Sequence, residues 1–245
     1  MAGHSKWANI RFRKGAQDAK RGKLFTKLIR EITVAARFGP DLESNPTLRA
    51  AVVKAKSNSM QKDSIDRAIK KGSGSDGSDD YDAIRYEGYG PMGVAILVDC
   101  LTDNRNRTVA DVRYSFSRFN GNLGAEGSVS YLFNQVGIIS FDSHECEDKI
   151  LELSIEAGAI DIDNHDDSSF DIICKPIDYE AINLMLNNNG FNPVNTEVLM
   201  RPDNYVTLDQ SSSETMIRLV DNLEDLDDVQ NVYTNADIPD EYLSS

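Results

Sequence analysis

The chain has 245 residues, 40% of them hydrophobic and 27% charged, a composition typical of a folded protein of one to three domains. No apolar run approaches the roughly 20 residues that a membrane-spanning helix needs, and the charged N-terminus lacks the apolar core of a secretory signal. The cysteines Cys100, Cys146 and Cys174 form no close pair, which favours free thiols in a reducing compartment, the cytoplasm.

Charge divides the chain more sharply than any other property. Residues 1–71 hold 17 Lys and Arg against 6 Asp and Glu, a net charge of +11, whereas residues 72–245 have a net charge of −25. Because a basic segment on an acidic protein increases self-repulsion, packing alone does not explain it, and a polyanionic partner does. A nucleic-acid backbone is the commonest such partner.

The first thirty residues contain nine of these cations and a single acid, Asp18. Residues 1–22 show little apolar periodicity and are predicted to form an arm that is mobile without its partner. Its tryptophan, Trp7, lies in a stretch too polar to bury it, so it either stacks on an unpaired base or docks on the neighbouring helices. An organelle-targeting peptide is the less favoured interpretation of this arm.

Helical periodicity begins at Lys23 and ends before Gly39 and Pro40. Asn45 and Pro46 mark the start of a second helix, which would bury Leu48, Ala51, Val52 and Ala55. A third helix carries Ile65, Ala68 and Ile69 and ends at Gly72. Three helices on one apolar seam predict a small helical domain, and the polar stretch 73–80 predicts a linker.

Beyond residue 80, strands are predicted at 84–89, 94–99, 128–133, 136–141, 159–163, 169–174, 194–200 and 229–234. Helices are predicted at about 102–120, 146–157, 177–187 and 213–223. Hairpins mixed with helices indicate antiparallel or mixed sheets in an α+β arrangement, and the last helix and strand are expected to return to the sheet that begins at residue 84.

The predicted fold is therefore α+β, with an N-terminal three-helix domain followed by two α+β domains, one inserted into the other. The predicted boundaries are 1–75 for the arm and helical domain, 80–141 plus 204–240 for the first α+β domain, and 142–203 for the inserted domain.

Motifs for enzyme chemistry are weak. The string Gly88 to Gly93 matches G-x-G-x-x-G, but a strand follows it, so a hairpin turn is expected and not a dinucleotide site. His144, Glu145 and Cys146 lack a second cluster that would complete a metal site. The acidic run Asp161, Asp163, Asp166 and Asp167 lacks the Gly and Glu of a calcium loop, so an acidic hairpin is expected. A non-enzymatic protein with no metal, cofactor, small-molecule substrate or membrane partner is predicted.

The segment Asn104, Arg105, Asn106, Arg107 is a second candidate for binding phosphate. Arginines at a helix N-terminus combine guanidinium groups with free backbone N–H groups, both suited to anions. The alternative is that these arginines pair with the abundant carboxylates of the acidic body, and the sequence favours neither.

Several motifs together resemble the YebC family of bacterial proteins and their mitochondrial relatives. These motifs are AGHSKWANIRFRKGAQDAKRGKLFTKLIREI, IRYEGYGP, LTDNRNRTVADVR, GNLGAEGSVSYLF and LEDLDDVQNVYTN, which extend over essentially the whole chain. Phe12 stands where a His is common in the family, which puts any His-dependent contact there in doubt. Met92 stands where a second Gly is common and restricts the turn slightly.

The resemblance implies the three-domain architecture given above and a function in gene expression. Bacterial members are described as probable transcriptional regulators that bind DNA, a mitochondrial relative activates translation, and bacterial relatives are linked to ribosomes on proline-rich stretches. The family's nucleic-acid-contacting motif falls on His4, Ser5, Lys6, Trp7, Asn9, Arg11, Arg13 and Lys14.

The sequence thus predicts a nucleic-acid-binding regulator, with a DNA-binding transcriptional regulator as the leading hypothesis. A ribosome-associated translation factor that binds ribosomal RNA is the close alternative, and a protein-interaction module acting through the acidic body is the third. The further predicted contact residues are Lys20, Arg21, Lys23, Lys27, Arg30 and the 104–107 segment.

Overall fold

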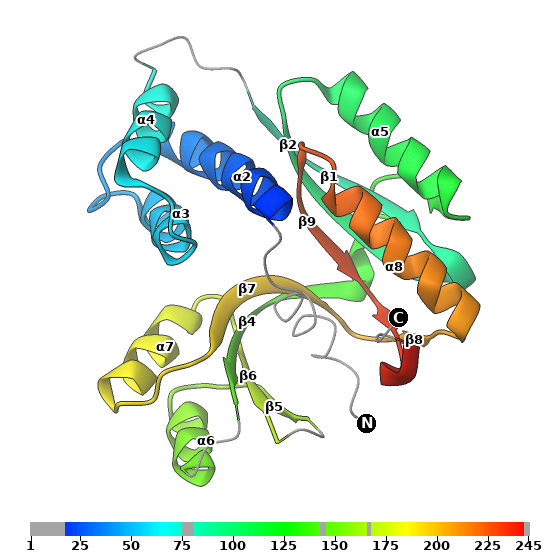
Figure 1. The fold of residues 1–245 in the computed structure, drawn as a ribbon. Coiled ribbons are helices and arrows are strands. Elements are labelled where there is room, and N and C mark those ends of the chain that lie inside the picture. The colour runs from blue at the N-terminus through cyan, green and yellow to red at the C-terminus, as the bar shows by residue number, and fades with distance from the viewer. Residues whose placement is uncertain (1–17, 75–80, 143–145, 166–167, 243–245) are drawn as a thin grey trace. The chain divides into compact units, whose positions relative to one another are not determined.

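The computed structural model describes residues 18–74, 81–142, 146–165 and 168–242, and these residues form two compact units (Figure 1). The first unit comprises residues 18–128 with Glu214–Val232, and the second comprises Val129–Ser213 with 233–242. The mixture of helices and antiparallel sheets confirms the predicted α+β class. The exact limits of the three predicted domains stay a prediction.

Three helices open the first unit: α2 (Asp18–Ala36), α3 (Pro46–Ser57) and α4 (Lys62–Gly72). Asn45 caps α3 as predicted, because its side chain accepts a hydrogen bond from the Leu48 backbone N–H at 3.0 Å. The predicted start of the first helix at Lys23 was wrong by one turn. Residues 18–22 contain good helix formers but few apolar residues, so periodicity alone misses the turn that they form.

The helical domain has its own apolar core, which contains every residue predicted for the second helix. Among the described residues this core is formed by Leu28, Ile32, Ala35, Ala36, Leu48, Ala51, Val52, Ala55, Met60, Ile65 and Ala68. The C-terminal end of α4 packs closely against α2, since a Cβ atom added at Gly72 would lie 2.2 Å from the backbone oxygen of Thr33.

The first sheet begins with the hairpin of β1 (Asp82–Tyr89) and β2 (Ala95–Thr102), which are antiparallel. The connecting turn, η1 (Pro91–Gly93), leads into a strand, so the G-x-G-x-x-G string forms a hairpin as predicted. Met92 and Gly93 have φ angles of 55° and 78° there.

The sheet order is β3-β1-β2-β9, where β3 is Asn122–Leu123 and β9 is Val229–Thr234. This order confirms that the last long strand returns to the sheet begun near residue 84.

Two helices cover one face of this sheet, α5 (Arg105–Arg118) and α8 (Gln210–Glu224) (Figure 1). A Cβ atom added at Gly88 would lie 2.7 Å from the Phe116 ring, and one at Gly90 would lie 3.0 Å from Met216 Sδ. Gly88 and Gly90 are two residues apart and so face the same side. On α5, Val112 and Phe116 are buried, whereas Val109 and Phe119 are half-buried.

The second unit is built on a four-stranded antiparallel sheet of order β5-β6-β4-β7. Its strands are β4 (Phe133–Phe141), β5 (Asp161–Asn164), β6 (Phe170–Cys174) and β7 (Asn195–Pro202). The helices α6 (Glu147–Glu156) and α7 (Tyr179–Asn188) contribute Ile150, Ile182 and Leu186 to its core. The pairing of β5 with β6 confirms the acidic hairpin, although Asp166 and Asp167 lie outside the described residues.

The predicted strand at 128–133 is wrong. Residues Ser130–Leu132 form a short 3-10 helix, η2, in which the Leu132 N–H donates to the Val129 oxygen at 3.0 Å. The Ser128 oxygen accepts from the Tyr89 hydroxyl at 2.8 Å, so these backbone groups are bonded outside any strand ladder. The two-residue strands β8 (Val206–Thr207) and β10 (Ala236–Asp237) are too short for a periodic pattern to reveal.

Candidate nucleic-acid interface

Most of the predicted contact motif lies outside the described residues, and its contacts stay predictions. This holds for His4, Ser5, Lys6, Trp7, Asn9, Arg11, Arg13 and Lys14. Lys20 and Arg21 lie in the first turns of α2, directly after that motif.

Three further predicted cations form a stripe on α2, because Lys23, Lys27 and Arg30 follow one another at spacings of four and three residues. They meet the loop between α8 and β9. Lys23 Nζ lies 2.9 Å from Asp225 Oδ1, and Lys27 Nζ donates to the Glu224 backbone oxygen at 2.9 Å. Hence two lysines predicted to bind nucleic acid are bonded to the acidic part of the same unit.

Arg30 completes this stripe and makes the most buried of its contacts. Its Nη1 lies 2.8 Å from Asp228 Oδ1 and also donates to the backbone oxygen of Asp227. Asp228 is only 6% exposed, and Arg107 Nη2 from α5 approaches its Oδ2 at 2.9 Å. The carboxylate thus lies between two guanidinium groups from distant parts of the chain.

Two hydroxyl groups complete the surroundings of Asp228. Thr102 Oγ1 lies 3.2 Å and Thr108 Oγ1 2.8 Å from Oδ2. Burial by itself would raise the pKa of Asp228, but the bonds from Thr108 and Arg107, with the charges of Arg30 and Arg107, outweigh it and lower that pKa below its ordinary value. Asp228 is accordingly ionised at neutral pH.

The 104–107 segment caps α5 and pairs with carboxylates. Asn104 is the N-cap, accepting from the Arg107 backbone N–H at 3.1 Å, and Asn106 is exposed. Arg105 Nε lies 2.8 Å from Asp82 Oδ2, while Arg107 bridges Asp228 and Asp103, the latter at 2.7 Å. This arrangement fits the interpretation that these arginines pair with the acidic body, and contact with phosphate stays a prediction.

Arg105 and Arg107 differ in how firmly they are held. The side chains of Arg105 and Asp82 are 67% and 49% exposed, so solvent screens their ion pair. Arg107 instead engages the buried Asp228. Of the two arginines, Arg105 is therefore the one that could exchange its carboxylate partner for a phosphate at the smaller cost in free energy.

Two cavities of the first unit fit anions poorly. One of about 600 Å³ next to Asp228 is lined by three cationic and five acidic side chains, and the acids are Asp103, Asp111, Asp225, Asp227 and Asp228.

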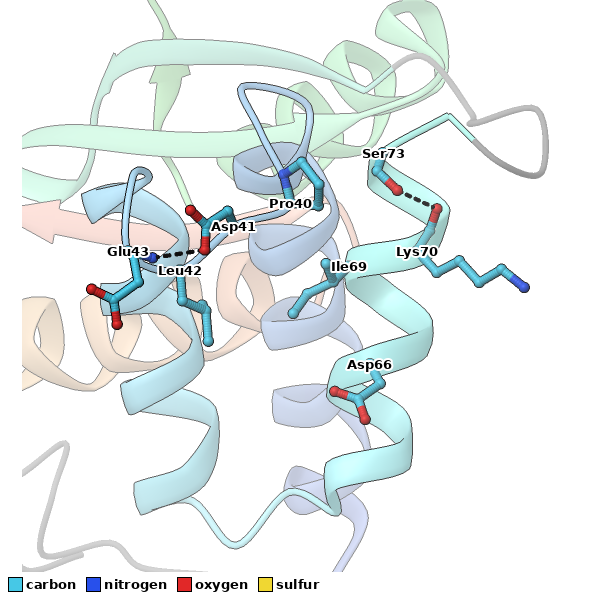
Figure 2. Close-up of a pocket in the computed structure, with 8 residues that line it drawn as sticks. All are labelled: Pro40, Asp41, Leu42, Glu43, Asp66, Ile69, Lys70 and Ser73. Carbon is cyan, nitrogen blue, oxygen red and sulfur yellow. Dashed lines mark hydrogen bonds between the residues drawn. The ribbon is translucent and has the colours of Figure 1, made fainter.

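The other cavity, of about 610 Å³, lies between α4 and the loop before α3 (Figure 2). Asp41, Glu43 and Asp66 line it with a single cation, Lys70. Both cavities would repel phosphate, so neither adds a nucleic-acid site.

The described residues also bear on catalysis and membrane insertion. They include no group of three His, Cys, Asp or Glu side chains that could hold a metal ion, and no helix of theirs is long and apolar enough to cross a membrane. Burial raises the pKa of Cys100 to about 12 and that of Cys174 to about 11. Both thiols are therefore protonated at neutral pH, which makes them poor nucleophiles.

The role of Asp228 could not be predicted from the sequence. Asp228 lies in LEDLDDVQ, a motif with several acidic residues whose spacing does not show which carboxylate is buried. The one available signal was complementarity between this acidic run and the cationic stripe about 200 residues earlier.

The fold and charge distribution define a class of protein: a basic three-helix domain joined to an acidic α+β body. Two family models match the chain, the N-terminal domain of TACO1/YebC proteins at residues 5–75 and the second and third domains of TACO1/YebC proteins at residues 81–236. The chain belongs to the TACO1/YebC family.

Relatives support this assignment over the full length. A probable transcriptional regulatory protein from Idiomarina loihiensis is 56% identical over 245 residues, which cover 100% of this chain and 98% of the relative. One of the same description from Coxiella burnetii is 57% identical, with 99% and 100% covered.

A solved structure is also similar. The crystal structure of a conserved hypothetical protein from Aquifex aeolicus has a TM-score of 0.82 and 42% identity, covering 93% of this chain and 95% of that one.

Proposed function

We propose that the protein is a nucleic-acid-binding regulator of gene expression that acts through its basic N-terminal segment. The observation that carries the proposal is the charge division, +11 in residues 1–71 against −25 in residues 72–245. A polyanion is attracted to the first segment and repelled by the rest, so it would meet the protein in one orientation. The names of the relatives, probable transcriptional regulatory proteins, support the same general function.

The described contacts suggest which of the predicted cations bind phosphate. Lys23 and Arg30 pair with Asp225 and Asp228, and Lys27 donates to the Glu224 backbone oxygen, so each of the three already has a partner within the protein. The proposal therefore assigns the principal phosphate contacts to the cations that precede this stripe. These are Lys6, Arg11, Arg13, Lys14, Lys20 and Arg21, with Arg105 as an outlying contact.

Removing residues 1–17 tests this assignment, because α2 begins at Asp18 and the stripe that starts at Lys23 stays intact. We expect the truncated protein to keep its helical content and to lose most of its affinity for a labelled random-sequence DNA duplex. Four cations are removed, so the slope of log affinity against log salt should become less steep by up to about 3 to 4.

A matched pair of double variants separates local from overall charge. Lys6→Gln with Lys14→Gln should weaken binding markedly, whereas Lys149→Gln with Lys175→Gln should not, although each pair removes two positive charges. Lys149 and Lys175 are exposed on the second unit. Equal losses in the two pairs, or unchanged affinity after truncation, would contradict the proposal and favour an interaction module that acts through the acidic body.

The leading form of the proposal is a cytoplasmic DNA-binding transcriptional regulator without catalytic activity, which the relatives' names favour. The second candidate is a ribosome-associated factor, and the observation that favours it is the pair of aromatic residues, Trp7 and Phe12, among the arm cations. Duplex bases are already stacked, whereas splayed RNA bases offer open faces.

Trp7→Ala distinguishes these two candidates. If the arm stacks on open bases, the variant should bind ribosomal RNA about 1–3 kcal/mol more weakly while its affinity for random duplex DNA barely changes. Titration of both ligands at one salt concentration measures this difference. Equal losses on both ligands, or tight binding to one promoter duplex without ribosome association, would favour the transcriptional form.

A further inference from the structure

The helical domain and the first sheet belong to one compact unit, and two groups of polar contacts join them. The apolar core of the helical domain contains residues of α2, α3 and α4 and of the segments that join them, and Leu24, Phe25, Leu42 and Ile69 pack against it. Polar contacts are directional, so they can hold one domain on another in a single orientation.

One group of these contacts surrounds Tyr81, at the start of the sheet. Arg37 Nη1 donates to the Tyr81 backbone oxygen at 3.1 Å. The guanidinium of Arg30 and the ammonium of Lys71 lie 5.6 and 5.9 Å from the centre of the Tyr81 ring. These cation–π contacts place positive charge from α2 and α4 against a residue of the sheet.

The second group is centred on Asp228 and is more buried. Its carboxylate joins Arg30 of α2 to Arg107 and Thr108 of α5 and to Thr102 of β2. The backbone oxygen of Asp228 accepts from the Leu101 N–H at 2.8 Å, so the carboxylate is held on the sheet itself. Of the contacts described for the helical domain, the one that reaches this carboxylate comes from Arg30.

The Lys23 and Asp225 pair beside it makes a useful contrast. It also joins α2 to the loop before β9, but its side chains are 43% and 59% exposed. Exposed pairs of this kind contribute little, whereas a buried carboxylate that loses one cation is left with uncompensated charge.

We infer that Asp228, Arg30 and Arg107 form an ionic latch that fixes the helical domain on the first sheet and so sets the direction in which α2 presents the basic arm. The latch is a property of the fold, and its effect on nucleic-acid binding rests on the proposed function. Asp228 is a positioning residue in this account, because it acts through Arg30 and touches no ligand.

Spin labels at Ser57→Cys and Ser117→Cys test the latch in the full chain, in a Cys146→Ser background. Ser57 ends α3 and Ser117 lies on α5, and both are exposed, as is Cys146. The wild-type contacts should give one narrow distance distribution. Arg30→Gln should broaden it, and the matched control Lys23→Gln should leave it narrow.

An unchanged distribution in Arg30→Gln would overturn the inference, as would equal broadening in Lys23→Gln. Should Arg30→Gln not fold, Arg30→Lys decides in the same way, because it keeps the charge but loses the planar group that reaches Asp228 and two backbone oxygens.

Affinity for a random-sequence DNA duplex gives a second readout. Whether Asp228→Asn weakens or strengthens binding distinguishes positioning by Asp228 from direct phosphate binding by Arg30 and Arg107. If Asp228 positions the arm, Asp228→Asn should weaken binding several-fold, and Asp225→Asn should change it less than twofold. If Arg30 and Arg107 instead bind phosphate directly, Asp228→Asn should strengthen binding, because it removes a repelling charge. Strengthened binding overturns the positioning role, while wild-type protein that binds no nucleic acid would refute the proposed function and leave the distance measurement to judge the latch.

Discussion

Substituting alanine for Gly72 should disrupt the packing of the helical domain. The added Cβ atom would lie 2.2 Å from the Thr33 backbone oxygen and 2.8 Å from the Ala36 Cβ atom. Real Cβ atoms essentially never come within 3.0 Å of such neighbours, and the nearest atom here is backbone, so no side chain can rotate away. The end of α4 must therefore move away from α2 by most of an ångström.

The magnitude follows from two opposing effects. Overpacking of a close contact typically costs about 1–3 kcal/mol. Alanine would normally gain about 0.5–1 kcal/mol over glycine within a helix, but Gly72 is the last residue of α4, so this gain is smaller. Displacement also weakens the bond from Thr33 Oγ1 to the Ala68 oxygen, at 3.4 Å. We expect a net loss of about 2 kcal/mol in the free energy of unfolding.

Urea titration followed by circular dichroism measures this loss, and a chain of this size should also melt about 4–8 °C lower. Lys70→Ala is the matched control, since Lys70 is exposed on the same helix and its substitution should change stability by less than about 0.5 kcal/mol. Equal stability of Gly72→Ala and Lys70→Ala would refute the close approach of α2 and α4.

Three further predictions concern the turn, the 104–107 segment and Asp228. Met92→Gly should stabilise the protein by about 0.5–1 kcal/mol in thermal melts, because Met92 has a φ of 55° and its side chain is 61% exposed. A loss of stability would instead show that the Met92 side chain makes stabilising contacts. Arg107→Glu should destabilise the protein by about 1.5–3 kcal/mol in urea titrations, because Arg107 bonds to the buried Asp228, and Arg105→Glu should cost clearly less, because its pair with Asp82 is exposed. Equal effects of the two substitutions would contradict this difference in burial. The pKa of Asp228 is lowered on folding, so its contribution to the free energy of unfolding is present above the ordinary pKa of 3.8 and is lost as the pH falls through the folded value. The difference in stability between wild type and Asp228→Asn should therefore shrink below about pH 4. A difference that does not depend on pH would contradict this prediction.

Local sequence signals predicted most of the elements. Asn45 and Pro46 fix the start of α3, because a side-chain cap and a fixed φ angle act within one turn. The β1–β2 hairpin was also predictable from a local signal, because the glycines and the proline between residues 88 and 93 determine a turn within a few residues. The alternating pattern at 128–133 wrongly predicted a strand, because such a pattern forms a strand only where a neighbouring strand edge offers hydrogen bonds. Here the backbone oxygens of Ser128 and Val129 accept instead from the Tyr89 hydroxyl and the Leu132 N–H.

The candidate interface was less predictable, because its contacts are distant in sequence. Nothing near Lys27 or Arg30 shows that Glu224 and Asp228, almost 200 residues later, bond to them. The structure bonds this cationic stripe to the acidic segment of the same unit, and its contact with nucleic acid stays a prediction. The alternative left open for the 104–107 segment, pairing with carboxylates, was visible only once β9 was placed beside β2.

The position of β9 has a consequence for synthesis of the protein on the ribosome. The basic stripe of α2 is made about 200 residues before the loop that bonds to it, and the edge of β2 stays without β9 until Val229, long after β2 ends at Thr102. During that time the nascent chain carries an uncompensated cationic helix, and its first sheet lacks one strand. Neutralisation of the helix and completion of the sheet come with the same late segment, so a chain that stalls before residue 224 would expose both defects together.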